Sequence, residues 1–297
     1  MIDVSGIYPP IPTPFYADEQ LAHQHLEANV QRWLTQPLDG IVTPGSNSEA
    51  AYLTFEERVT IWRICGDMLR STGKHLIAGT GAETTAETIR LTQHAAEAGA
   101  IAALVITPSF FRAGMTPAAL VAHFHTVADE SPIPVLVYNV PAFTSIDLAP
   151  QTILDMAAHR NIIGMKDSSA NVTKVAQVLA EQPDFQVLSG SGTTLLPFLS
   201  IGAVGGIMAL ANVAAPPLRR LVDAFAAGDF AEARRLQLAL VGLNTAITAR
   251  YGVPGLKYTL ERLGWYGGPS RRPLLPLGAE GRKELDHMLA ALGELLK

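Results

Sequence analysis

The chain has 297 residues, of which 48% are hydrophobic and 16% are charged. This length and composition allow a sizeable core, in one large α/β barrel or in two ordinary domains. The net charge is −5, and no run of lysines or arginines forms a basic patch. Nucleic acid is therefore not expected as a partner.

The sequence also argues against a membrane protein. Residues 1–6 lack the basic start and apolar core of a secretory signal, and the longest apolar run, 201–211, is too short to cross a bilayer. The single cysteine, Cys65, lies in an apolar helical stripe, so we expect a core thiol rather than a nucleophile. These features predict a cytoplasmic protein without a membrane partner.

Short apolar runs that are typical of buried strands recur along the first two thirds of the chain. Eight strands are predicted, at residues 6–15, 40–45, 75–79, 102–107, 135–138, 161–166, 185–188 and 204–209. The prolines in the first run favour an edge or end position over a long central ladder. Helical patterns stand between the strands, and one of them opens with a capping box at Thr54-Phe55-Glu56-Glu57.

Eight strands that alternate with helices predict the α/β class and a (β/α)8 TIM barrel, because all-apolar strands suit a parallel sheet covered on both faces. A doubly wound open sheet is the alternative, since periodicity does not distinguish an open sheet from a closed one. After Pro216-Pro217 the pattern is purely helical. We expect a barrel over residues 1–215 and a C-terminal helical extension over 216–297, packed together as a single structural unit.

In barrel enzymes catalytic residues lie at the C-terminal ends of strands, and two candidates stand there. Lys166 ends the sixth strand, where a desolvated amine could attack a ketone and form a Schiff base. It could instead be the first solvated loop residue, or pair with Asp167. Tyr138 ends the fifth strand beside it and could carry protons, or could point into the helix layer.

Other strand exits carry weaker signals. Ser46 and Asn47, after Gly45, offer a hydroxyl, an amide and backbone donors that suit a small carboxylate, although such a turn is also an ordinary helix cap. Gly190-Ser191-Gly192 follows the seventh strand but completes no dinucleotide fingerprint. No cluster of cysteines, histidines or carboxylates completes a metal site, so neither a metal nor a cofactor is expected.

Four motifs stand at strand exits, in order. They are Gly45-Ser46-Asn47-Ser48-Glu49, Tyr138-Asn139-Val140-Pro141, Gly164-Met165-Lys166-Asp167, and Gly205-Gly206-Ile207 through Ala211-Asn212. With this set the chain resembles the dihydrodipicolinate synthase / N-acetylneuraminate lyase family over nearly its whole length. The resemblance implies a (β/α)8 barrel, usually a tetramer, and a Schiff base between the lysine and pyruvate or another 2-oxo acid.

The resemblance also implies a role for individual residues. By it, Lys166 is the nucleophile and Tyr138 the proton carrier, while Ser46 takes part in catalysis and forms the carboxylate seat with Asn47. The carbonyl of Ile207 lines the site. We further expect Gly190, at the exit of the seventh strand, to contact the substrate.

Two aromatic positions are among those that depart from the family pattern. Dihydrodipicolinate synthases carry an arginine after Tyr-Asn-Val-Pro that holds the carboxylate of aspartate semialdehyde, and Phe143 stands there in this chain. An apolar ring cannot replace that ion pair. The second family tyrosine is matched by Phe110. We expect Phe110, Phe111 and Phe143 to line an apolar mouth, with Phe110 and Phe143 contacting the substrate.

These observations predict a Schiff-base lyase or aldolase that joins or splits a 2-oxo acid, pyruvate first among them, and an aldehyde with less charge than aspartate semialdehyde. Three alternatives stay open: 4-hydroxy-tetrahydrodipicolinate (dihydrodipicolinate) synthase itself, a 2-keto-3-deoxy acid dehydratase that uses the same imine, and a barrel that only binds a 2-oxo acid. The resemblance implies a homo-oligomer, a tetramer or a dimer.

Overall fold

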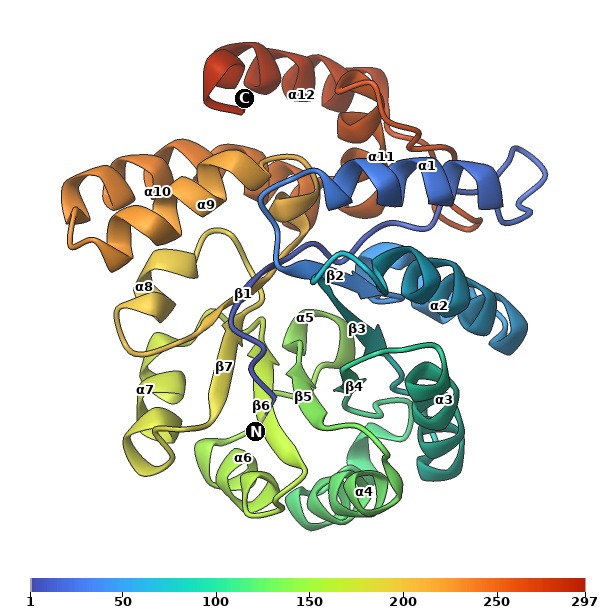
Figure 1. The fold of residues 1–297 in the computed structure, drawn as a ribbon, viewed down its shortest axis with the longest axis vertical. Coiled ribbons are helices and arrows are strands. Elements are labelled where there is room, and N and C mark those ends of the chain that lie inside the picture. Colours follow the sequence, from blue (N-terminus) through green and yellow to red (C-terminus); the bar gives the residue numbers. More distant parts are fainter. Residues whose placement is uncertain (1, 297) are drawn as a thin grey trace.

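Eight parallel strands form the sheet of the computed structural model, which describes residues 2–296. Their bounds are β1 (Gly6–Tyr8), β2 (Gly40–Thr43), β3 (His75–Gly79), β4 (Ala102–Ile106), β5 (Val135–Asn139), β6 (Ile162–Asp167), β7 (Gln186–Ser189) and β8 (Gly205–Ile207). Hydrogen-bonded neighbours follow the order β1-β8-β7-β6-β5-β4-β3-β2. The two ends of this order meet at a bridge between Pro10 and Val42, so the sheet closes into a barrel (Figure 1). The predicted TIM barrel is confirmed, and the doubly wound alternative is wrong because the strand order never reverses.

The first strand is shorter than the predicted run of residues 6–15. Several prolines follow it directly, and because proline has no backbone N–H the ladder cannot continue through them. β1 pairs with β8 over three residues, and beyond it the N–H of Ile11 donates to the carbonyl of Val42 on β2. The prolines therefore lie at the seam of the barrel, which confirms the end position that they predicted.

The helices between the strands form an outer layer around the barrel. They are α1 (His23–Leu34), α2 (Phe55–Leu69), α3 (Thr85–Glu97), α4 (Pro117–Glu130), α6 (Pro150–Ala157), α7 (Val172–Glu181) and α8 (Leu195–Leu199). The short helix α5 (Pro141–Thr144) lies instead at the carboxyl end of β5. Short 3-10 helices are η1 (Ser46–Ser48), η2 (Ala50–Tyr52), η3 (Arg112–Gly114), η4 (Ala209–Asn212) and η6 (Gly293–Leu296). The predicted capping box opens α2: the Thr54 hydroxyl accepts from the N–H of Glu57, whose carboxylate accepts from the N–H of Thr54.

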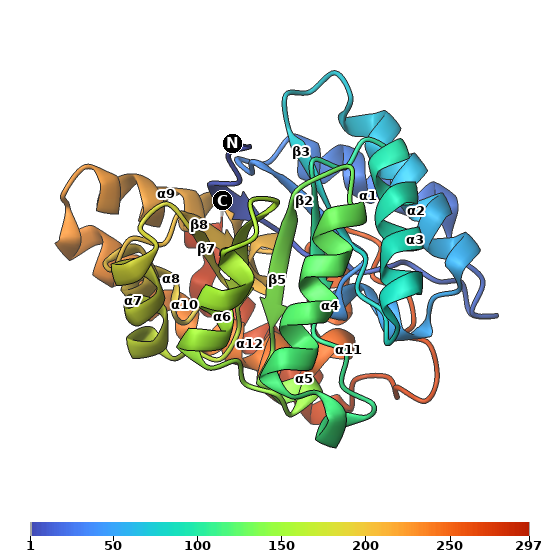
Figure 2. The same cartoon turned by 90° about the horizontal axis from the view of Figure 1, so that it is seen from below.

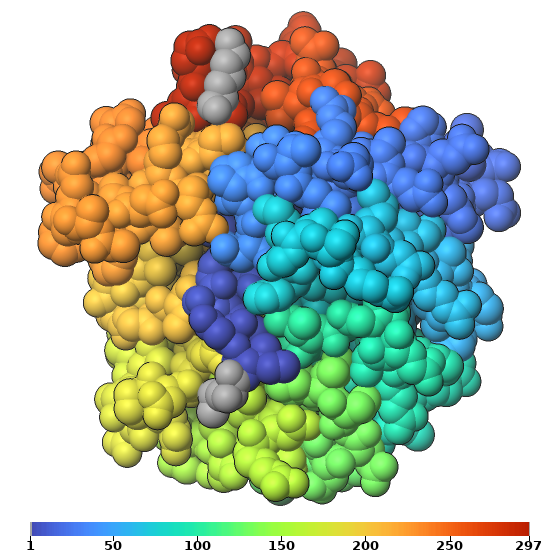
Figure 3. Space-filling model, in the orientation of Figure 1, coloured from blue at the N-terminus to red at the C-terminus, as the bar shows by residue number. Residues whose placement is uncertain are grey.

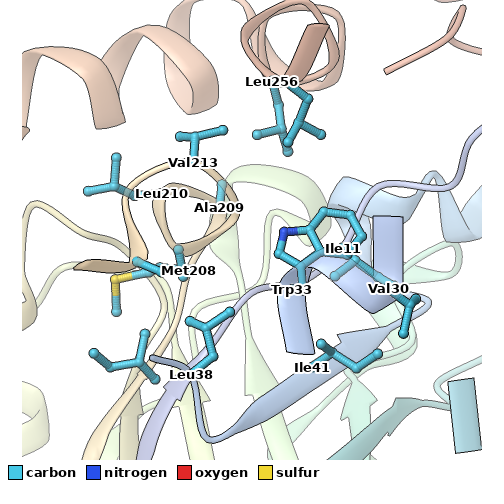
Figure 4. Close-up of a cluster of buried hydrophobic side chains, with 14 of the residues drawn as sticks. Ile11, Val30, Trp33, Leu38, Ile41, Met208, Ala209, Leu210, Val213 and Leu256 are labelled. Atoms are coloured by element: carbon cyan, nitrogen blue, oxygen red, sulfur yellow. The ribbon is translucent and has the colours of Figure 1, made fainter. Parts of the chain in front are cut away.

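The C-terminal helices pack against the barrel on one side (Figure 1). They are α9 (Ala215–Ala226), α10 (Phe230–Thr245), the π-helical turn η5 (Ala246–Arg250), α11 (Gly252–Arg262) and α12 (Ala279–Leu292). Leu256 of α11 belongs to the same buried cluster as Trp33 of α1 and Leu210 of η4 (Figure 4). The extension thus shares a continuous core with the barrel helices.

Side chains along each strand alternate between the barrel interior and the helix layer. On β5, Leu136 and Tyr138 belong to an interior cluster, whereas Val135 and Val137 pack with the surrounding helices. Figure 2 shows β5 running from the side that carries the N-terminus toward the short helix α5. The carboxyl ends of the strands, where the candidate residues stand, therefore lie on the α5 side.

The opposite end of the barrel is closed by the start of the chain. Val4 is buried in the interior cluster, and its N–H donates to Gln186 Oε1 at the start of β7 over 2.8 Å. Gln186 Nε2 donates in turn to the carbonyl of Ile2. In the space-filling view this first segment, in dark blue, lies across the middle of its face (Figure 3). A small molecule would thus approach the interior from the carboxyl ends of the strands.

Two further predictions concern the whole chain. Cys65 is buried in the core and unpaired, and burial raises the pKa of its thiol, so the predicted core thiol is confirmed. Of the helices within residues 2–296, none is long and apolar enough to cross a membrane. The cytoplasmic location stays a prediction.

Candidate active site

Lys166 on β6 is buried among the strands, and the described part of the chain offers it no charge partner. It is 4% exposed, and its Nζ lies 4.2 Å from the centroid of the Tyr138 ring. Across residues 2–296, no group forms a hydrogen bond or ion pair with this amine. The alternative in which Lys166 is the first solvated loop residue is therefore wrong. A buried cation without a partner is expensive, and desolvation of this kind is how proteins activate nucleophilic lysines.

Tyr138 on β5 is the register partner of Lys166, so the two residues stand on adjacent strands. It is 5% exposed and packs in the interior cluster with Leu136 and Ile207, so the placement in the helix layer is wrong. Its phenol oxygen lies 3.4 Å from Ser46 Oγ, and either hydroxyl can donate. The two hydroxyls connect Tyr138, which lies beside Lys166, with the turn after β2, and they could pass a proton between them.

The turn that carries Ser46 and Asn47 is held by Ser48. Ser48 Oγ accepts from the N–H of Gly45 over 2.9 Å and donates to the carbonyl of Ile11, and the carbonyl of Ser48 accepts from the Thr13 hydroxyl over 2.7 Å. Ser46 and Asn47 are both half-buried, and Ser46 Oγ faces the Tyr138 hydroxyl. Their role as a carboxylate seat stays a prediction, and it now has a rigid base.

Asp167 does not pair with Lys166. Successive residues of a strand point to opposite faces, and Asp167 lies fully buried on the helix side, where Lys174 Nζ contacts its carboxylate at 3.0 Å. Asn139 Nδ2 donates to the same carboxylate oxygen, Oδ2, over 2.8 Å. The backbone N–H and the hydroxyl of Ser169 both donate to the other oxygen, Oδ1. The expected alternative of a Lys166–Asp167 pair is wrong because Asp167 already has these partners.

A second buried ion pair lies beneath the turn after β2. Glu49, which follows the turn with a φ of 58°, contacts Lys257 Nζ of α11 at 2.6 Å, and both side chains are almost fully buried. The N–H of Arg271 donates to the other oxygen of Glu49 over 2.7 Å. Burial lowers the pKa of Lys257, and the Glu49 carboxylate opposes this shift. The extension therefore supports the segment that presents Ser46.

Comparison with known proteins gives the family. A sequence model of the Dihydrodipicolinate synthetase family matches residues 3–292. The chain is 34% identical over 290 residues to the 4-hydroxy-tetrahydrodipicolinate synthase of Methanococcoides burtonii, covering 97% of this chain and 98% of that protein. It is 35% identical over 295 residues to the protein of the same name from Methanothrix thermoacetophila, covering 98% and 97%. The solved structure of the 4-hydroxy-tetrahydrodipicolinate synthase of Methylacidiphilum fumariolicum SolV matches with a TM-score of 0.93 at 30% identity, covering 99% of this chain and 97% of that one. This chain belongs to the Dihydrodipicolinate synthetase family.

Members of the Dihydrodipicolinate synthetase family are pyruvate-dependent class I lyases or aldolases that act through a Schiff base. The resemblance and the activity class predicted from the sequence are confirmed at this level. The roles of individual residues and the choice of the second substrate depend on the side chains at the strand exits, which vary within one fold.

The phenylalanines that depart from the family pattern are largely exposed. Phe110 is 79% exposed and Phe143 is 68% exposed, and Phe110 packs edge to face against Phe111 with ring centroids 5.1 Å apart. The backbone of this segment is fixed, since the Glu83 carboxylate accepts from the N–H groups of Ser109 and Phe110. Within this single chain the rings stand open to solvent, and their contact with substrate stays a prediction.

Gly190 and Ile207 occupy two further strand exits. The N–H of Gly190 donates to the carbonyl of Asp167 over 2.7 Å, and a Cβ at Gly190 would come within 1.9 Å of Ser168 Oγ. Only glycine therefore allows the exits of β6 and β7 to pack this closely. Ile207 is fully buried beside Tyr138. Their contacts with substrate stay predictions.

Sequence patterns were not used to predict that Lys174 and Lys257 are buried, or that they form ion pairs with carboxylates. A signal was present in both helices, because each lysine stands within an apolar stripe: Lys174 next to Val175 and Val178, and Lys257 next to Leu256 and Leu260. A lysine at such a position needs a buried partner. For residues 2–296, no group of three or more His, Cys, Asp or Glu side chains could hold a metal ion.

Proposed function

We propose that this chain is a class I lyase that joins or splits pyruvate and an aldehyde, with Lys166 as the Schiff-base lysine. The observation that carries the proposal is a buried amine for which residues 2–296 provide no counter-ion, 4.2 Å from the centroid of the Tyr138 ring, whose hydroxyl is hydrogen-bonded to Ser46. Family membership supplies the chemistry, and this amine is the group that can perform it.

The reaction follows from these groups. The neutral amine of Lys166 adds to the keto carbon of pyruvate, and the carbinolamine loses water to give the imine. Tyr138 carries the proton from the attacking nitrogen to the departing hydroxyl, with Ser46 as its hydrogen-bond partner. Loss of a methyl proton gives an enamine, whose carbon adds to the aldehyde, and hydrolysis frees the product and the lysine. Ser46 and Asn47 hold the carboxylate of pyruvate during these steps.

The second substrate is an aldehyde with less charge than aspartate semialdehyde. Phe143 stands where an arginine is expected from the resemblance, and its exposed ring offers no partner for a carboxylate. The competing reading is 4-hydroxy-tetrahydrodipicolinate synthase, which the names of the similar proteins favour. Only the substrate differs between the two readings, because both use the same imine.

We also propose that the chain forms a homo-oligomer, a tetramer or a dimer. The proposal is supported by the exposed rings of Phe110 and Phe111, because side chains of this size that remain in water are common where another subunit covers them.

The decisive experiment is borohydride reduction in the presence of pyruvate. We expect one covalent adduct, located on Lys166 by peptide mass spectrometry, and none in a Lys166→Met variant that keeps the wild-type melting temperature. Adduct on Lys174 or Lys257 would contradict the assignment of the nucleophile. Absence of any adduct on the folded protein would contradict the activity itself.

A further inference from the structure

Asn139 and Asp167 form the rung of the β5–β6 ladder that directly follows the rung of Tyr138 and Lys166. Because strand side chains alternate, one rung faces the barrel interior and the next faces the helix layer. Asn139 and Asp167 therefore lie on the outside of the wall that carries the reacting pair. Their two side chains are joined by the hydrogen bond from Asn139 Nδ2 to Asp167 Oδ2.

Lys174 of α7 and Asp147 of the segment after α5 complete this cluster. Lys174 Nζ contacts the carboxylates of both Asp147 and Asp167. Asn139 Nδ2 also donates to Asp147 over 2.9 Å, and Asn139 Oδ1 accepts from the N–H of Leu148 over 3.1 Å. The buried ammonium thus joins α7 to the exit of β6 and to the loop, and Asn139 joins the same two carboxylates to the exit of β5.

Such a cluster is a costly way to fill the helix layer. Lys174 is 4% exposed and Asp167 is fully buried, and well-packed apolar residues often stabilise such positions as well as a buried ion pair does. What a charged cluster adds is directional contact. Imine formation needs the tyrosine hydroxyl and the amine within a fraction of an ångström of their reactive arrangement, and misplacement by about 1 Å can cost about 100-fold in rate.

We infer that Lys174 is a positioning residue for the proposed reaction: it fixes the two carboxylates that accept from Asn139 Nδ2, so it locks the exits of β5 and β6 to one another and holds Tyr138 against Lys166. This inference rests on the proposed function, since it assigns a role to a residue that touches no substrate. Two consequences separate it from a purely structural role. Loss of Lys174 slows imine formation more than its effect on folding explains, and it loosens the hydrogen bonds between the two strand exits.

The test compares Lys174→Met with Val175→Ala, a matched change at a buried neighbour on the same helix that lies outside the cluster. Both variants are followed by thermal unfolding and by the rate at which borohydride traps the pyruvate adduct. We expect Lys174→Met to slow trapping about 100-fold and Val175→Ala to slow it less than about threefold at a similar loss of thermal stability. Equal rates in the two folded variants would overturn the inference.

Hydrogen exchange gives a readout that needs no pyruvate chemistry. The N–H of Ser168 donates to the carbonyl of Asn139 over 2.9 Å, so its exchange rate reports how firmly the two exits are joined. We expect exchange of this amide to be about tenfold faster in Lys174→Met and unchanged in Val175→Ala. If wild type formed no adduct, the proposed function would fail while this measurement still decided whether Lys174 locks the exits.

A milder variant covers the case in which Lys174→Met does not fold. Asp147 is about half exposed, and Asp147→Asn removes one of the two carboxylate charges that hold Lys174 Nζ, so the ammonium should hold the strand exits less firmly than in wild type. We expect this variant to fold, to trap the adduct about tenfold more slowly than wild type, and to exchange the Ser168 amide faster. Wild-type values for both rates in Asp147→Asn would overturn the inference.

Discussion

The interior around Lys166 and the base of the turn at Glu49 each bury one lysine, but only one of these lysines is paired. Lys257 contacts the Glu49 carboxylate and donates to the carbonyl of Pro269, whereas Lys166 has the face of Tyr138 as its polar neighbour. Both sites remove a lysine amine from water, and burying it in its charged form is expensive. Pairing makes the first lysine a structural tie, whereas the second, for which residues 2–296 provide no charge partner, is the proposed nucleophile.

Removing the Tyr138 hydroxyl should have the largest effect on the proposed reaction at Lys166. Tyr138→Phe keeps the ring beside the amine and removes the hydroxyl that we propose as the proton carrier, so we expect imine formation to slow by about 10²- to 10⁴-fold with little loss of stability. The measurement is single-turnover trapping of the pyruvate adduct.

Tyr8→Phe is the matched control for this change. Tyr8 lies in the same interior cluster, but its hydroxyl donates to the carbonyl of Ser5, near the closed end of the barrel. We expect it to lower stability by about 1 kcal/mol and to leave the trapping rate within about threefold of wild type. A similar slowing in both variants would remove the special role of Tyr138.

Removing the charge of Lys257 should break the other side of the comparison. Lys257→Met leaves Glu49 buried without its ion pair, and we expect a loss of about 3–5 kcal/mol in the free energy of unfolding, measured with urea. The exposed Lys283→Met should change it by less than about 0.5 kcal/mol.

A double variant shows whether pairing is the cause. Burial lowers the pKa of Lys257 despite its partner, so the pair does not fully offset the cost of removing the ammonium from water. Glu49→Gln combined with Lys257→Met should therefore be more stable than Lys257→Met alone. If the two losses simply added, the ion pair would not be what holds the turn.

The difference between these regions also explains what the sequence could predict. The placement of Lys166 and Tyr138 could be predicted from the sequence because each ends an apolar run, and parallel strands bring such ends to one edge. The partner of Glu49 could not be predicted. The apolar stripe around Lys257 indicates burial, but it does not say which residue the amine contacts, and Glu49 is more than 200 positions away in the sequence. For Asp167 the sequence could exclude one partner, since strand alternation places its side chain and that of Lys166 on opposite faces.

The exposure of the aromatic rings could not be predicted from the sequence, for a different reason. An apolar residue at a strand exit suggests a lining group, but its burial depends on the path of the loop and on what covers it. Here the Glu83 carboxylate holds the backbone of the loop at Ser109 and Phe110, and the ring of Phe110 is left in solvent. Neither the hydrogen bonds nor the resulting exposure has a signature in the local sequence.

Phe143→Arg should have the smallest effect on activity. It adds a cation at an exposed strand exit, in contrast to the two buried lysines. Phe143 is 68% exposed, so an ion pair formed there with a substrate carboxylate would contribute less than about 1 kcal/mol. We expect the KM for aspartate semialdehyde to fall by up to about fivefold while the trapping rate with pyruvate alone stays unchanged. Phe143→Leu, which removes the ring without adding charge, is the matched control. If both variants changed KM equally, the ring and not the missing charge would limit this substrate, and the argument against 4-hydroxy-tetrahydrodipicolinate synthase from the missing arginine would fall.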